Sequence, residues 1–93
     1  MSTLTNVFAA HANATGTIYS GATNLGGSQI KPGGTAGAIE FFNGGASGTK
    51  LLEIDITTNT AIISTLLPGN GIRFTTDIYV TLPTGAAITI FCG

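Results

Sequence analysis

Residues 41–52, "FFNGGASGTKLL", combine glycines with a serine, a threonine and a lysine, the residue types found in phosphate-binding loops. A P-loop has the pattern G-x-x-x-x-G-K-[ST] and lies between a strand and a helix whose N-terminus faces the phosphate. Counted from Gly44, the second glycine position holds Thr49, and Lys50 is followed by Leu51 instead of Ser or Thr. The next residues alternate as in a strand, so no helix is expected there. The stretch is therefore predicted to be a hairpin loop whose glycines supply positive φ angles.

The other residues with reactive side chains are few. His11 is the only histidine, and neither an orienting neighbour for a general base nor a set of metal ligands can be inferred around it. Cys92 is the only cysteine, so it forms no internal disulfide and is expected to be a small buried apolar side chain. Glu53 and Asp55 would lie about 7 Å apart on one strand, a spacing that resembles a glycosidase carboxylate pair. Carboxylates at i and i+2 are more typical of a solvated strand face, so we predict no catalytic residue, cofactor or metal, and no enzyme.

Arg73 and Asp77, in "GIRFTTDI", are four residues apart and follow the turn signal "PGNG". On a strand, Arg73 faces away from its apolar neighbours Ile72 and Phe74. A charge at a subunit interface is costly to bury unless it is paired, and an arginine can pair through two parallel hydrogen bonds. We hypothesise that Arg73 and Asp77, in the same or adjacent subunits, form an orienting contact at an assembly interface. A ligand-binding role for Arg73 is the alternative.

The segments that carry these residues have the period of strands rather than of helices. Gly and Pro separate about eight short runs rich in β-branched and aromatic residues. These runs are 15–21, 28–34, 37–42, 50–56, 59–67, 72–76, 78–82 and 87–93. The pattern predicts an all-β fold, a small antiparallel β-sandwich or jelly-roll-like domain. A helical turn is the exception considered, within "LTNVFAAHA" at residues 4–12.

Alternation within four of these runs predicts which side chains face the core. The expected core residues are Ile39, Phe41, Leu52, Ile54, Ile56, Ile63, Phe74, Ile88 and Ile90. The sandwich is expected over residues 15–93 as a single domain. Residues 1–14, which end in an Ala- and Asn-rich stretch, are expected to form a flexible or contact-making N-terminal arm.

The composition bears on the partners of the chain. Only 8% of the 93 residues are charged and the net charge is -1, so the chain has neither the cationic patch of a nucleic-acid-binding protein nor a basic face for membranes. Such weak charge also gives little self-repulsion against association. With 43% apolar residues, a homo-oligomer is expected, a trimer being favoured. The N-terminus lacks a basic region followed by an apolar run, so synthesis in a cytoplasm without recognisable export is expected.

The last 60 or so residues resemble a group of short, glycine-rich structural proteins of tailed bacteriophages, many from marine and cyanobacterial phages. Their pattern looks like A-G-x-[IV]-x-[FL]-x-[ND]-G-G-x-x-G-T-x-L-L, then G-x-G-I-R-F-x-T-D-[IV]-x-[VA]-x-L, then [IV]-T-[IV]-[FY]-x-G. Residues 37–52, 69–82 and 88–93 match it. Cys92 stands where such proteins often carry an aromatic residue.

The resemblance implies a component of a phage particle without enzymatic activity. Our leading hypothesis is a small capsid cement or decoration protein, which would bind the major capsid protein or other virion proteins. A tail or adaptor component is the alternative within the particle. A β-sandwich module for host surface glycans is the alternative outside it, although the chain has no Trp and only two Tyr for stacking on sugars.

Overall fold

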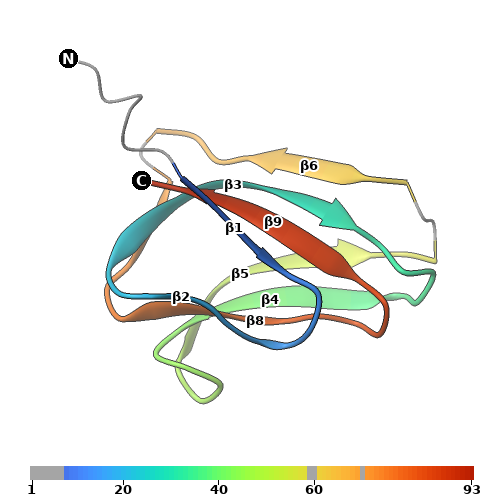
Figure 1. Cartoon of the computed structure of the whole chain (residues 1–93), viewed down its shortest axis with the longest axis horizontal. Coiled ribbons are helices and arrows are strands. Elements are labelled where there is room, and N and C mark those ends of the chain that lie inside the picture. Colours follow the sequence, from blue (N-terminus) through green and yellow to red (C-terminus); the bar gives the residue numbers. More distant parts are fainter. Residues whose placement is uncertain (1–7, 59–60, 70) are drawn as a thin grey trace.

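The computed structural model describes residues 8–58, 61–69 and 71–93, and all regular structure in these ranges is β-strand (Figure 1). The strands are β1 Phe8–Ala12, β2 Gly16–Ser20, β3 Thr23–Lys31, β4 Gly37–Asn43, β5 Thr49–Ile56, β6 Ile63–Leu66, β7 Ile72–Phe74, β8 Asp77–Thr81 and β9 Ala87–Cys92. The all-β fold predicted from the sequence is confirmed. Part of the expected arm (1–7) and the first two residues of the run expected over 59–67 lie outside the described residues.

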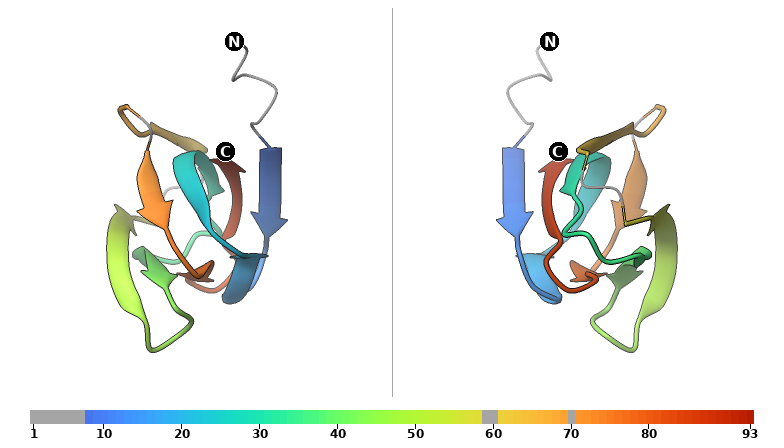
Figure 2. Two further views of the ribbon diagram at one scale, coloured as in Figure 1. Left: turned by 90° about the vertical axis from the view of Figure 1, so that its left-hand side faces the viewer. Right: turned by 90° about the vertical axis from the view of Figure 1, so that its right-hand side faces the viewer.

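The strands form two antiparallel sheets that pack as two layers, seen from either side in Figure 2. The first sheet has the order β1-β9-β3-β6, with β7 also paired to β3, and the second has the order β2-β8-β4-β5. Strands β6 and β7 follow one another along the same edge of β3, against its residues 27–30 and 23–25 respectively. Counted as one interrupted strand, they complete eight strand positions in two four-stranded sheets, which is the jelly-roll arrangement.

A glycine turn interrupts that edge between β6 and β7. The N–H of Gly71 donates to the carbonyl of Pro68 at 3.1 Å, and Gly71 has a φ of 78°. A Cβ at this position would lie 2.0 Å from the carbonyl oxygen of Leu25 on β3, so both the φ angle and the space require glycine. The "PGNG" signal therefore marks a break within one sheet edge.

The core lies between the sheets and is built from alternate residues of each strand. Its buried apolar side chains are Leu25, Ile30, Ile39, Phe41, Ile56, Phe74, Ile78, Val80, Ala86, Ile88, Ile90 and Cys92. Six of the nine predicted core residues are among them. The other three, Leu52, Ile54 and Ile63, are partly buried against the core, because they lie on β5 and β6, at sheet edges.

Three expectations for the N-terminal part of the chain differ from the structure. Residues Phe8–Ala12, within the stretch where a helical turn was considered, form β1 and pair with β9 over five residues, so this prediction is wrong for residues 8–12. The strand expected from residue 28 begins at Thr23 instead. Its first part was not predicted because it contains Gly26 and Gly27, and glycine is unfavourable in strands. Residues 8–12, expected to belong to the arm, are the edge strand of the first sheet.

Candidate contact face

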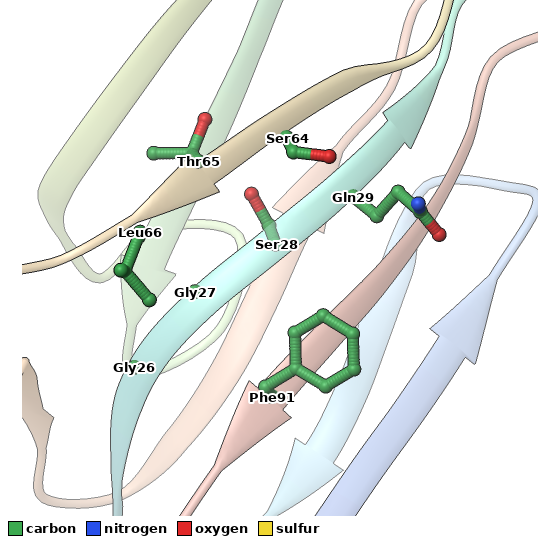
Figure 3. A pocket seen from close by; sticks show the side chains of 8 residues that line it. All are labelled: Gly26, Gly27, Ser28, Gln29, Ser64, Thr65, Leu66 and Phe91. Carbon is green, nitrogen blue, oxygen red and sulfur yellow. The ribbon is translucent and has the colours of Figure 1, made fainter.

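We define face A as the outward side of the first sheet and face B as the outward side of the second. Face A contains a groove of about 300 Å³ (Figure 3), floored by the glycines of β3 and flanked by Phe91 and Leu66. In the strand register Gly27 pairs with Phe91 on β9 and with Leu66 on β6, so the three residues form one row across the sheet. The groove exists because the middle position of this row has no side chain.

Packing explains why that position is glycine. A Cβ on Gly27 would lie 2.8 Å from the carbonyl oxygen of Thr65 on the neighbouring strand. Glycine in a strand interior often marks such a close approach of another backbone. The same residue that permits the pairing of β3 with β6 therefore leaves the hollow on the outer surface.

Large apolar side chains are exposed along this face. Leu66 is 88% exposed, Ile62 60% and Phe91 41%. Ile62, just before β6, lines a second hollow of about 190 Å³ together with His11, Gln29, Lys31, Ala87, Ile88 and Thr89. Gln29 lines both hollows, so they lie side by side on face A. Clustered exposed apolar side chains of this kind mark contact surfaces.

The charged residues divide between the two sheets. All four carboxylates lie on the second sheet, in Glu40, Glu53, Asp55 and Asp77, and Lys50 lies there too. The first sheet carries Lys31 on β3 and Arg73 on β7 and no acidic side chain. The chain is therefore cationic on one layer and anionic on the other, although its net charge is only -1.

On face B the polar side chains largely bind one another. Glu40 and Glu53 are directly opposite in the register, and the Nζ of Lys50 lies 3.3 Å and 2.6 Å from their respective carboxylate oxygens. Hydrogen bonds to Glu53 and then Glu40 raise the pKa of Lys50 above its usual value. Thr81 also donates to Glu40 at 3.3 Å. The lysine offsets the repulsion that two carboxylates opposite each other would otherwise have.

The predicted pair, Arg73 and Asp77, has separate partners within the chain. Nη1 of Arg73 donates to Oδ1 of Asn24 at 3.3 Å. Oδ1 of Asp77 accepts from the backbone N–H groups of Gly44 at 2.9 Å and Gly45 at 3.1 Å. The described residues contain no ion pair between them, and a contact between adjacent subunits stays a prediction.

Asp77 also explains the loop that resembles a phosphate cradle. Residues 44–48 join β4 to β5 as the predicted hairpin loop, and Gly44 and Gly45 have φ angles of 105° and 84°. Their N–H groups point at the carboxylate of Asp77, so the anion held there belongs to the chain itself. Asn43 braces the same corner by accepting from the N–H of Thr76 at 2.9 Å.

The other candidate reactive residues are dispersed. Cys92 is buried, as predicted, and this burial raises the pKa of its thiol to about 11, although a hydrogen bond with Thr23 acts in the opposite direction. Such a thiol is a poor nucleophile at neutral pH. His11 is exposed on β1 with its Nδ1 2.9 Å from Oγ1 of Thr89, and Glu53 and Asp55 are exposed on β5. Within residues 8–58, 61–69 and 71–93, no three His, Cys, Asp or Glu side chains gather into a metal site.

The groove beside Phe91 was not predicted from the sequence. The available signal was the pair Gly26–Gly27 within a run of strand-forming residues. No helix that could cross a membrane occurs in the described part of the chain. Comparisons with family models, curated proteins and solved structures found no significant match to this chain.

Proposed function

We propose that the chain is a non-enzymatic structural protein of a bacteriophage particle, a small capsid cement or decoration protein that assembles as a symmetric oligomer. The observation that carries the proposal is the exposure of Leu66, Ile62 and Phe91 on face A. Exposed apolar residues on a weakly charged surface favour a protein that is covered by a neighbour in its working state.

Two further features support this assignment. The jelly-roll arrangement is common in viral capsid domains, although this is support by fold analogy alone. The resemblance of residues 37–52, 69–82 and 88–93 to phage structural proteins points the same way. A capsid also offers many copies of a symmetric site, which a cyclic oligomer fits.

Particles purified from the phage that encodes this chain test the proposal. Quantitative mass spectrometry should find the chain in numbers comparable with those of the major capsid protein. A few copies per particle would instead assign it to the tail or an adaptor. Absence from purified particles would overturn the proposal.

A binding experiment tests the role of face A. Purified chain added to particles that lack it should bind, and the variant Leu66→Asp should not, because a charge would disrupt the apolar contact that covers face A, with the particle or with a neighbouring copy of the chain. Thr84→Asp is the matched control, since Thr84 is exposed in the loop between β8 and β9. Equal binding of Leu66→Asp and the parent chain would remove face A from the proposal.

A further inference from the structure

We propose that copies of this chain assemble head to tail, with face A of one copy packed against face B of the next. This inference rests on the proposed function as far as that function needs a multi-copy assembly. It adds the two surfaces that meet and the pair of charges that aligns them.

The first argument comes from the charges left over within one chain. Glu40, Glu53 and Lys50 form ion pairs, and Asp77 and Arg73 are bonded to the hairpin loop and to Asn24. Lys31 and Asp55 are the two charged side chains that have no ion-pair or hydrogen-bond partner among the described residues. They are exposed, opposite in sign and on opposite faces, Lys31 on face A and Asp55 on face B.

The second argument comes from the apolar surface. Face B carries an aromatic pair, Phe42 and Tyr79, whose half-buried rings pack edge to face with centroids 6.3 Å apart. Face A carries the groove at Gly27, whose walls Phe91 and Leu66 are apolar. An aromatic side chain seated between them would cover the surface that the fold leaves exposed.

The spacing on the two faces brings these features into register. On β3, Lys31 is four residues from Gly27, the floor of the groove. On β4, Ala38 is four residues from Phe42, and Asp55 pairs directly with Ala38. Both offsets amount to about 13 Å at the rise of a strand. Asp55 is displaced to the side by a further strand spacing of about 4.8 Å. With the aromatic pair in the groove, Asp55 of one copy therefore comes close enough to Lys31 of the next for the long lysine side chain to reach it.

Packing of face A against a second face A fits less well. It would bring Lys31 and Arg73 of one copy close to Lys31 and Arg73 of the other. The first sheet has no acidic side chain that could offset this repulsion. Contact between two different faces makes a heterologous interface, which closes into a ring when the rotation between neighbours permits it and otherwise continues as an open stack of copies.

An exchange of the two charges tests the proposal. Lys31→Asp and Asp55→Lys should each weaken assembly about tenfold, because each places like charges across the interface. The double variant Lys31→Asp/Asp55→Lys restores an opposite-charge pair between neighbours and keeps the net charge of the parent, so it should assemble within about threefold of the parent. Sedimentation velocity over a concentration series measures all three, with Thr84→Asp as the control and circular dichroism to verify the β-fold.

The outcomes separate this inference from the proposed function. Recovery in the double variant supports the head-to-tail contact. A double variant as weak as the single variants, or single variants that assemble like the parent, overturns it while leaving the particle-binding result intact. A parent chain that stays monomeric throughout overturns this inference and also the oligomer in the proposed function.

Discussion

Faces A and B belong to sheets of the same sandwich, but their outward side chains differ in how they are used. On face B, Lys50 joins two carboxylates and Phe42 packs on Tyr79, so most large or charged groups have a partner in the chain. On face A, Leu66 and Ile62 are more than half exposed beside a groove with a glycine floor. The exposed apolar side chains of face A therefore contribute little to the stability of the fold. We expect them to be buried when the chain assembles.

The largest expected effect tests whether the core and face A play separate roles. Phe41→Ala, in the core on the inner side of the second sheet, should lower the free energy of unfolding by about 3–5 kcal/mol because it leaves a cavity. Leu66→Ala removes an exposed side chain and should change that free energy by less than about 0.5 kcal/mol. Urea unfolding at a concentration where the chain is monomeric measures both. Comparable losses in the two variants would erase the distinction between core and contact face.

The second prediction concerns the inner side of β9, next to Phe91 on face A. An unfolded Cys92 thiol loses its proton near its ordinary pKa of 9.0, whereas the folded thiol keeps it until about pH 11. The folded state binds more protons between these values, so stability should fall as the pH rises from about 9 to about 11. Lys50, whose folded pKa is also raised, contributes in the same direction. Cys92→Ala should therefore lose part of the fall, measured as unfolding free energy against pH. Identical profiles for Cys92→Ala and the parent would show that the thiol is not buried in solution.

The third and smallest effect tests whether the carboxylate of Asp77 serves the hairpin loop. Asp77→Ala removes the acceptor for the N–H groups of Gly44 and Gly45 and should cost about 1 kcal/mol, because water can replace it at this partly exposed corner. Asp55→Ala is the matched control, since Asp55 is an exposed acid on the same face. Its loss should leave the stability of the monomer nearly unchanged. Hydrogen exchange should also speed up at Gly44 and Gly45 in Asp77→Ala alone, and unchanged exchange there would refute the loop assignment.

Most strands of the fold could be predicted from the sequence, because the alternation of apolar and polar residues is visible within each short run. Ile88, Ile90 and Cys92 were predicted to be buried, and the structure agrees. The first half of β3 was missed because strand propensity disfavours Gly26 and Gly27, whereas the close approach of the carbonyl of Thr65 requires a glycine at position 27.

The site was less predictable because it depends on pairing between distant strands. The groove needs Gly27, Leu66 and Phe91 in one row, and no local pattern reveals that register. Arg73 and Asp77 are close in sequence, but residues 75–76 cross between the sheets, so β7 places Arg73 on the first sheet and β8 places Asp77 on the second. Although Arg73 and Asp77 are only four residues apart in the sequence, they therefore do not contact each other within the chain.

The central claim is that face A is covered when the chain assembles. Hydroxyl-radical footprinting with mass spectrometry tests it most directly, comparing the parent chain at a dilute, monomeric concentration and at a concentrated, assembled one. Oxidation of Leu66 and Phe91 should fall several-fold on assembly. Oxidation of Tyr19 should stay constant, because Tyr19 does not line the groove and its ring packs on that of Phe8, with the centroids 5.0 Å apart. Unchanged oxidation of Leu66 and Phe91 in the assembled chain would contradict the claim.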